Sequence, residues 1–298
     1  MRIVFASGKG GAGKTTVTAS LAALWPRPVI AADCDVEAPN LHLFLTPDLP
    51  EHAAITLDVP VLNAEKCTAC GACKDICQYR AIARFGRKVL VFPDMCHGCG
   101  GCFAVCPEGA LDTGKRELGA LEEGTFSAAG ARGRFIMGRT RIGEAMTPPL
   151  LRALLARLEN MTAQAGDDVL IDSPPGVSCP AMTVAGRADM AGLVAEPTPF
   201  GFHDFKLAHA AFARTGAELA VVMNRSGMEG NEAGDAALRA WCAERRLPLL
   251  AELPFDRAAA EQYAGGGLIA RTSPLWERRF RALAEALLQR AEQGGRHA

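Results

Sequence analysis

Short apolar runs alternate with amphipathic stretches along most of the chain. The run RIVFA at 2–6 is followed by a glycine-rich turn and a helical pattern over 14–24, and the run PVIAAD follows at 28–33. A strand, turn, helix and strand at this spacing predict a βαβ unit in a parallel sheet with a right-handed crossover. Further apolar runs lie at 168–174, 190–197, 218–224 and 248–254, and helical patterns lie near 149–163, 204–215, 232–246 and 274–293. This alternation predicts an α/β fold with a doubly wound, mostly parallel sheet.

The alternation breaks between residues 60 and 114. Eight of the eleven cysteines lie there in two similar runs, CTACGACKDIC and CHGCGGCFAVC, and RKVLVF at 87–92 between them predicts a short strand. The stretch that follows is rich in Gly and Arg, and its pattern is irregular to about residue 147. We therefore expect one α/β domain formed by 1–59 and 115–298, with a small α+β domain at 60–114 inserted after the second strand.

The composition argues against several classes of protein. The formal net charge of −1 creates no field that would attract nucleic acid, so we expect no specific nucleic-acid partner. No apolar run reaches the roughly 18 residues of a membrane span, and MRIVFASGKGG lacks the features of a signal peptide. We therefore expect a cytoplasmic protein without a stable membrane anchor, whose last helix at 274–292 covers the sheet. In a reducing compartment, clustered cysteines indicate metal ligands rather than disulfides.

The stretch GKGGAGKT at 8–15 matches the phosphate-loop pattern and lies between the first strand and the first helix. Glycines let backbone N–H groups turn towards phosphate oxygens, and the helix N-terminus adds its positive dipole end. Lys14 would neutralise the β- and γ-phosphates, and the Thr15 hydroxyl would ligate Mg²⁺. The residues that we expect around the phosphates are Gly8, Gly10, Gly11, Ala12, Gly13, Lys14, Thr15 and Thr16.

Acidic residues stand at the ends of two predicted strands, in DCD at 33–35 and in DSPPG at 172–176. The carboxyl ends of parallel strands form the edge at which ligands bind, so we expect these carboxylates beside the phosphate loop. Asp33 is either a supporting group in that site or a cap for the end of its strand.

The eight clustered cysteines have the spacing of iron–sulfur ligands. Both runs read C-x₂-C-x₂-C-x₃-C, as in bacterial two-cluster ferredoxins, where the fourth cysteine of each run ligates the other cluster. This pattern assigns one [4Fe–4S] cluster to Cys67, Cys70, Cys73 and Cys106, and a second to Cys96, Cys99, Cys102 and Cys77. Structural zinc favours two separated cysteine pairs, so the spacing favours iron–sulfur clusters. His97 could tune a cluster, although a solvent-facing histidine is the commoner case.

Three cysteines lie outside these runs. We expect Cys34 and Cys242 to be small buried side chains. For Cys179 we favour a structural role over that of a ligand to a cluster shared between two subunits, because no cysteine lies between Cys106 and Cys179.

Taken together, these motifs resemble the MinD/ParA/Mrp family of P-loop ATPases, and in particular its members with an inserted ferredoxin domain. The resemblance rests on Lys9 beside the first glycine of the loop, on DSPPG, on EPTPFGFHD at 196–204 and on the eight cysteines. It implies that Lys9 reaches the nucleotide of a partner subunit, so that ATP hydrolysis depends on dimerisation. The dimer would be a homodimer or a heterodimer with a related subunit.

The same resemblance implies roles for further residues. Asp172 would hold Mg²⁺ as the Walker B residue, and Asp35 would serve the Mg²⁺ site and orient or activate the attacking water. Asn224, Pro254 and Phe255 would surround the adenine of ATP.

The leading hypothesis is an ATPase in which nucleotide-dependent dimerisation is coupled to electron transfer through two [4Fe–4S] clusters, with an unknown redox partner. The predicted nucleotide switch at 33–35 lies in the same crossover as the cysteines, so a change at the γ-phosphate could move the insertion. One alternative is an ATPase that assembles iron–sulfur clusters or delivers them to an acceptor, although the C-terminal half has no C-x-x-C. Another is a MinD/ParA-like positioning ATPase whose clusters act as a redox sensor.

Overall fold

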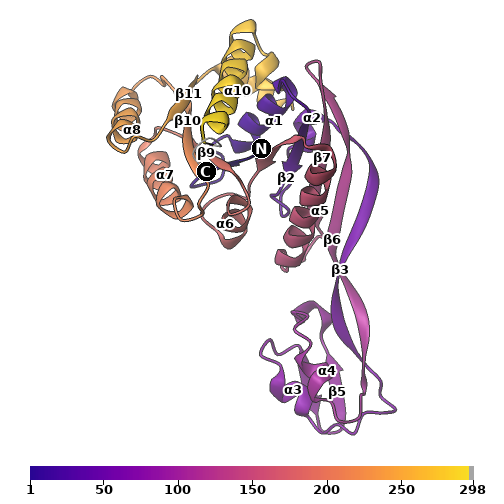
Figure 1. Cartoon of the computed structure of the whole chain (residues 1–298). Coiled ribbons are helices and arrows are strands. Elements are labelled where there is room, and N and C mark those ends of the chain that lie inside the picture. Colours follow the sequence, from indigo (N-terminus) through magenta and orange to yellow (C-terminus); the bar gives the residue numbers. More distant parts are fainter. Residues whose placement is uncertain (295–298) are drawn as a thin grey trace.

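The computed structural model describes residues 1–294, and its centre is a nine-stranded sheet (Figure 1). In spatial order the strands are β11 (Leu249–Pro254), β10 (Glu218–Ser226), β9 (Met190–Ala195), β1 (Arg2–Ala6), β8 (Asp168–Asp172), β2 (Val29–Asp33), β7 (Ala131–Thr140), β6 (Leu111–Ala128) and β3 (Asp48–Leu62). The strands from β11 to β7 pair in parallel, and β6 and β3 extend the sheet by antiparallel pairing. The prediction of a mostly parallel α/β sheet is confirmed.

Helices cover both faces of this sheet. One face packs against α1 (Lys14–Leu24), α9 (Arg257–Ala264), α10 (Pro274–Gly294) and the short elements α2 (His42–Leu45) and η2 (Ile269–Arg271). The other face packs against α5 (Pro148–Ala165), α6 (Cys179–Ala185), α7 (Pro199–Phe212) and α8 (Glu232–Glu244). In the described part of the chain, no helix is both long and apolar enough to cross a membrane.

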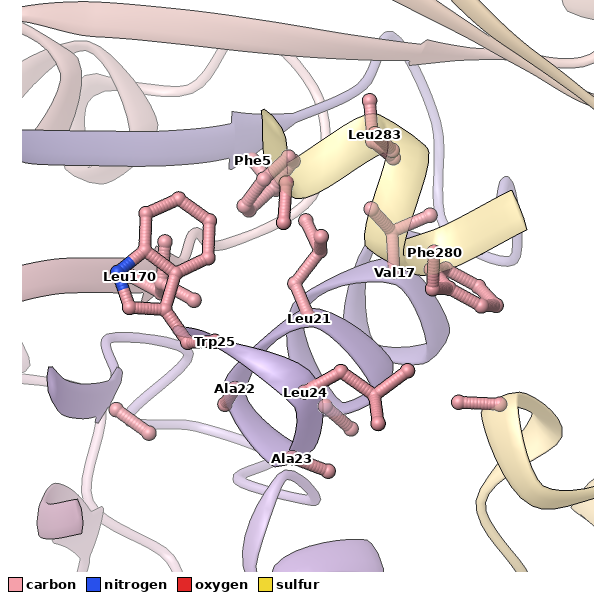
Figure 2. Close-up of a cluster of buried hydrophobic side chains, with 14 of the residues drawn as sticks. Phe5, Val17, Leu21, Ala22, Ala23, Leu24, Trp25, Leu170, Phe280 and Leu283 are labelled. Atoms are coloured by element: carbon pink, nitrogen blue, oxygen red, sulfur yellow. The ribbon is translucent and has the colours of Figure 1, made fainter. Parts of the chain in front are cut away.

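The packing of α1 against α10 and the sheet fixes the segment that follows the phosphate loop. Figure 2 shows Leu21 of α1 between Phe5 of β1 and the α10 side chains Phe280 and Leu283. All four are at most 1% exposed, and burying side chains of this size stabilises the fold by about 1.5–3 kcal/mol each. The helix therefore begins where the sequence predicts it, directly after the last glycine of the loop.

Helix α7 begins earlier than the predicted range 204–215. Thr198 Oγ1 accepts the N–H of Gly201 at 3.1 Å, and Pro199 takes the first helical position, which is a common way to start a helix. The apolar pattern missed this first turn because it turns Phe200 outward, with 82% of the residue exposed.

The prediction of an irregular stretch up to residue 147 is wrong, because β6 and β7 occupy most of 111–140. These two strands form an antiparallel hairpin, and β3 pairs with β6 along nearly its whole length, from Asp48 opposite Thr125 to Leu62 opposite Leu111. The partners β3 and β6 are far apart in the sequence, and much of β3 is exposed. Local apolar alternation therefore does not mark these strands.

The β3–β6 ribbon carries the cysteine-rich segment away from the rest of the molecule (Figure 1). We call residues 63–110 the cysteine lobe and the remainder of the described chain the α/β core. The lobe contains α3 (Ala72–Ile76), α4 (Gly101–Val105), η1 (Pro93–Met95) and a hairpin of β4 (Ile82–Phe85) and β5 (Lys88–Val91), which includes the strand predicted at 87–92. The predicted domain boundaries at 60 and 114 fall inside β3 and β6, and the division into separate domains stays a prediction.

Candidate functional site

A cavity of about 410 Å³ lies beside the phosphate loop, between the start of α1, the end of β10 and the layer of α9 and α10. Ligand pockets usually measure about 300–1,000 Å³, so this cavity has the size for a nucleotide. Most of the predicted nucleotide-site residues line it, namely Gly10, Gly11, Gly13, Lys14, Thr15, Thr16, Asp35, Asn224, Pro254 and Phe255. The fold thus brings together residues from four separate stretches of the chain, and their roles stay predictions.

The backbone of the phosphate loop requires glycine at two of these positions. Gly11 and Gly13 have φ of +78° and +100°, in the region that disfavours side chains. Lys14 is buried, and its Nζ lies 3.2 Å from Ser7 Oγ, so the ammonium group is held against the loop.

Two predicted loop residues do not line the cavity. Gly8 packs against the neighbouring helix, since a Cβ at this position would lie 2.1 Å from the carbonyl oxygen of Asp204. Ala12 is buried, and its carbonyl oxygen accepts a hydrogen bond from Asn224 Nδ2 at 2.9 Å. Both residues therefore hold the phosphate loop against neighbouring elements on the side away from the cavity.

Asp172 stands behind Thr15 at the end of β8 and is 1% exposed. Its Oδ2 accepts the Thr15 hydroxyl at 2.5 Å, whereas its Oδ1 is buried without a hydrogen-bond partner. Burial, and then the negative charge of Asp33, raise the pKa of Asp172 well above its usual value. A buried carboxylate oxygen without a donor is costly unless a cation or proton reaches it, so Asp172 and Thr15 fit an Mg²⁺ site.

The structure separates the two aspartates of DCD. Asp33 is fully buried, and its Oδ2 accepts the N–H groups of Asn40 and Leu41 at 2.8 and 2.9 Å, so it caps the turn after β2. Burial raises the pKa of Asp33 to about 7. Asp35 lines the cavity; burial raises its pKa, while the charge of Lys14 acts in the opposite direction.

Lys9 does not line the cavity and forms an ion pair within its own chain. Its Nζ lies 2.9 Å from Glu196 Oε2, and Arg225 Nη1 lies 3.0 Å from the other oxygen of the same carboxylate. Burial opposes ionisation of Glu196, but the hydrogen bonds from the two cations hold its pKa below its usual value. The action of Lys9 on a partner's nucleotide stays a prediction.

Sequence reasoning missed one wall of the cavity. It includes Arg225, Tyr263, Ile269 and Trp276, which lie with Asp256 in the lining of the cavity. Trp276 Nε1 donates to Asp256 Oδ2 at 2.7 Å, and Asp256 also caps α9. The one available signal was an N-cap aspartate before RAAAEQ, because α9 is too short to show a long apolar stripe.

The cysteine lobe contains two further cavities, each lined by four cysteines. The first, which we call the Cys67 cavity, is lined by Cys67, Cys70, Cys73 and Cys106. The second, the Cys96 cavity, is lined by Cys77, Cys96, Cys99 and Cys102. Each run thus contributes its fourth cysteine to the other cavity, which is the arrangement that the spacing predicts.

Backbone N–H groups approach four of the eight sulfur atoms, whereas burial raises the pKa of the Cys73 and Cys102 thiols. In each run, the sulfur atoms of the first and the fourth cysteine each accept one backbone N–H at 3.3–3.4 Å. The pairs are Ala69–Cys67, Ala81–Cys77, Gly98–Cys96 and Ala110–Cys106. Across residues 1–294, no three His, Cys, Asp or Glu side chains form a group that could hold a single metal ion. The four cysteines of each cavity instead line a small space of about 20 Å³.

The other cysteines divide into buried and exposed. Cys34 and Cys242 are buried, as predicted. Cys179 is exposed at the start of α6, and its structural role stays a prediction. His97 is exposed, and its ring stacks on that of Tyr79 with 3.7 Å between centroids, at the Cys96 cavity.

Comparisons with known proteins agree with this architecture. The sequence model of the family described as CobQ/CobB/MinD/ParA nucleotide binding domain matches residues 3–269. The uncharacterized protein MJ0578 of Methanocaldococcus jannaschii is 32% identical over 231 residues, which cover 76% of this chain and 79% of that protein. The crystal structure of the Pyrococcus furiosus cell division ATPase MinD is 22% identical with a TM-score of 0.59, covering 97% of this chain and 98% of that one. The septum site-determining protein MinD of Pyrococcus horikoshii, complexed with Mg-ADP, has 22% identity, a TM-score of 0.56, and coverage of 96% and 95%.

Proposed function

Since the chain belongs to the CobQ/CobB/MinD/ParA nucleotide-binding domain family, we propose that it is an ATPase that binds Mg²⁺-ATP in the cavity beside the phosphate loop. Lys14 would neutralise phosphate charge, and Thr15 and the unpartnered Oδ1 of Asp172 would hold Mg²⁺. Mg²⁺, when bound, offsets the negative charge of the phosphates. Asp35, which lines the same cavity, would orient the attacking water.

Dimerisation would complete this site. Lys9 is one-third exposed and bonded to Glu196, so it would have to exchange that partner for a phosphate of a second subunit. The second subunit is a copy of this chain or a related protein. We therefore expect the hydrolysis rate per chain to rise with protein concentration, as for any reaction that requires two subunits.

We further propose that residues 60–114 form a ferredoxin-like domain that holds two [4Fe–4S] clusters, and that ATP-dependent dimerisation is coupled to electron transfer through them. The observation that carries this proposal is the crossed set of four cysteines around each of two cavities. Thiolates in this arrangement ligate such clusters, which supply one-electron chemistry when bound. The N–H groups aimed at four of the sulfur atoms would stabilise the thiolate charge.

The test begins with anaerobically purified protein. Iron and acid-labile sulfide should be present, and Cys70→Ser should remove about half of both, since one cluster loses a ligand. Cys179→Ser is the matched control, because Cys179 is also an exposed cysteine but lies outside both cavities. Protein that takes up no iron and sulfide under reconstitution would refute the cluster proposal and leave the ATPase proposal intact.

Coupling is tested on the same samples. The ATPase rate is measured with the clusters oxidised and with dithionite-reduced clusters, and the midpoint potentials are measured with and without Mg²⁺-ATP. Because linkage is reciprocal, potentials that shift with nucleotide require nucleotide affinity to change with reduction. Iron-loaded protein that responds in neither direction would refute coupling.

A second candidate function is delivery of a cluster to an acceptor protein. It is favoured by the exposure of Cys70 and Cys99, which gives each cavity one ligand at the surface. Delivery predicts that ATP accelerates the loss of iron and sulfide to a cluster-free ferredoxin, with the acceptor gaining what this chain loses. A MinD/ParA-like positioning ATPase, the third alternative, predicts neither transfer nor ATP-dependent potentials.

A further inference from the structure

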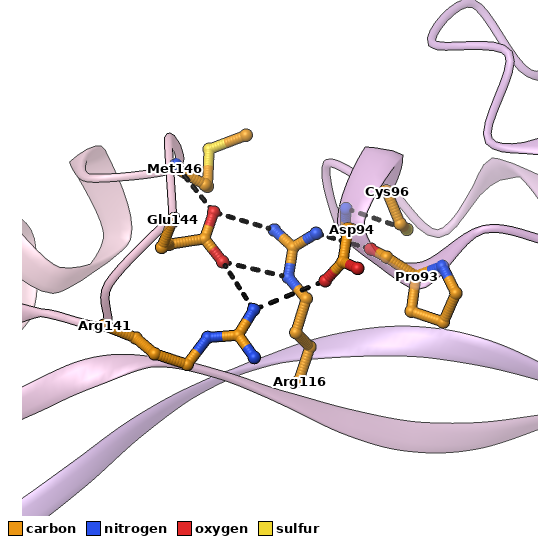
Figure 3. A network of polar contacts seen from close by, with 8 residues as sticks. Pro93, Asp94, Cys96, Arg116, Arg141, Glu144 and Met146 are labelled. Carbon is orange, nitrogen blue, oxygen red and sulfur yellow. Dashed lines mark hydrogen bonds and ion pairs between the residues drawn. The ribbon is translucent and has the colours of Figure 1, made fainter.

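A buried ion pair lies where the cysteine lobe meets the α/β core. Arg116 of β6 and Glu144 of the loop after β7 have side chains 5% and 4% exposed, with Arg116 Nε 3.4 Å from Glu144 Oε2 (Figure 3). A second nitrogen, Nη2, lies 3.5 Å from Glu144 Oε1. Removing one member of a buried pair leaves an unpaired buried charge, so the two side chains hold each other in place.

On the lobe side, Arg116 is bonded to the segment that leads into the Cys96 cavity. Its Nη1 donates to the carbonyl oxygen of Pro93, and the N–H of Cys96 donates to that same oxygen at 3.0 Å. Arg141 Nη2 adds an exposed ion pair to Asp94 at 3.3 Å, which water and salt weaken. A movement of Arg116 therefore acts directly on the backbone at a predicted cluster ligand.

On the core side, Glu144 is connected to the predicted nucleotide switch. Its Oε1 accepts the N–H of Met146 at 2.8 Å, and the next residue, Thr147, donates its hydroxyl to Glu37 Oε1 at 3.4 Å. Glu37 follows Asp35 by two residues, and Asp35 lines the nucleotide cavity. Backbone and side-chain hydrogen bonds from Thr140 to the carbonyl of Val36 tie the same segment to the end of β7.

The two cysteine cavities differ in how they meet the core. The Cys96 cavity is lined by Asp58 and Pro60 of β3, whereas the Cys67 cavity is lined by Leu62 and Leu111, at the outer end of the ribbon. Arg84, the arginine beside the Cys67 cavity, donates to carbonyl groups within the lobe, those of Ala69 and Cys70. The Cys96 cavity is therefore the one connected to the predicted nucleotide switch at 33–35.

We propose that the Arg116–Glu144 pair transmits a conformational change from nucleotide bound beside Asp35 to the Cys96 cavity. The Cys67 cavity is not affected by this change. This inference rests on the proposed function and deepens it, because it names the cluster that senses nucleotide. Arg116 and Glu144 are positioning residues, which act through the backbone of 93–96. The outer cavity then remains free to face a redox partner.

The test uses the full chain with its clusters and measures amide hydrogen exchange with and without Mg²⁺-ATP. In the wild type, nucleotide should change exchange in the 93–99 segment by about fivefold or more, the lower end of ordinary coupling between sites, with little change in 67–73. Glu144→Gln, which keeps the shape of the side chain, should abolish this response. Thr147→Val should also abolish it while leaving the ion pair intact, because it removes only the hydroxyl that reaches Glu37.

Arg84→Gln is the matched control, since it removes a guanidinium whose hydrogen bonds go to carbonyl groups within the lobe. It should retain the full nucleotide response, and all variants should still bind ATP. The Cys96-cavity potential, assigned through Cys99→Ser, should shift with nucleotide in the wild type and in Arg84→Gln but not in Thr147→Val.

Each outcome decides one proposal. A nucleotide response that persists in either Glu144→Gln or Thr147→Val overturns the proposed role of the Arg116–Glu144 pair and leaves the proposed function standing. A response centred on the Cys67 cavity also overturns it. Iron-loaded wild-type protein that binds ATP and shows no response in either cavity overturns coupling itself, and this inference with it.

Discussion

Substituting alanine for Gly13 should separate the phosphate loop from β10. A Cβ at this position would lie 2.2 Å from Asn224 Nδ2, which donates to the carbonyl oxygen of Ala12 at 2.9 Å. No such contact is possible, so Asn224 must rotate away and its hydrogen bond must break. The loop would then lose its link to the strand that carries the predicted adenine contact.

The magnitude has two parts. Gly13 has φ of +100°, and holding alanine in the left-handed region costs about 1–2 kcal/mol. Losing the Asn224 hydrogen bond costs about 1 kcal/mol more, so Gly13→Ala should lower the free energy of unfolding by about 2–3 kcal/mol. Gly11→Ala is the matched control, because φ is +78° there and no atom lies within 4 Å of the new Cβ. Its cost should be the backbone part alone, about 1–2 kcal/mol.

The assay is urea unfolding without nucleotide, for both variants in the wild-type background and in an Asn224→Ala background. The extra cost of Gly13→Ala over Gly11→Ala should disappear when Asn224 is already truncated. Equal destabilisation by the two alanine variants in the wild-type background would refute the reasoning, and so would an excess that survives truncation.

Three further predictions concern the buried charges and the core. Asp172→Asn removes a buried carboxyl whose pKa is raised by burial, so it should raise the melting temperature of nucleotide-free protein. It should also abolish the Mg²⁺-dependent part of the stabilisation by ATP. A thermal shift with ATP that still depends on Mg²⁺ would contradict this. Burial raises the pKa of Asp33 from 3.8 to about 7, so the folded chain retains a proton that the unfolded chain has released, and the free energy of unfolding should fall as pH rises through that window. Denaturation at a series of pH values should show a flatter slope for Asp33→Asn, and an unchanged slope would count against it. Phe280→Ala, at a fully buried position (Figure 2), should cost about 3–5 kcal/mol in equilibrium unfolding, and a loss below about 1 kcal/mol would show that the packing of α10 is misjudged.

Features that depend on local chemistry could be predicted from the sequence. Helix α1 begins directly after the loop glycines, because its apolar face and the loop are contiguous in the chain. The crossed pairing of cysteines is expected because the spacing of both runs matches that of bacterial two-cluster ferredoxins, in which the fourth cysteine of each run ligates the other cluster. The position of Asp172 behind Thr15 follows from the edge at which parallel strands end.

Tertiary structure alone decided which distant segments meet. β3 and β6 are separated in the sequence by the whole cysteine lobe, and the largely exposed β3 gives no apolar alternation that a local reading could detect. The Lys9–Glu196 and Arg116–Glu144 ion pairs join charged residues, which a sequence reading would place on the solvent-exposed surface. Side-chain type and spacing determine what a segment can bind, whereas long-range pairing and the burial that follows from it determine which segments share a site.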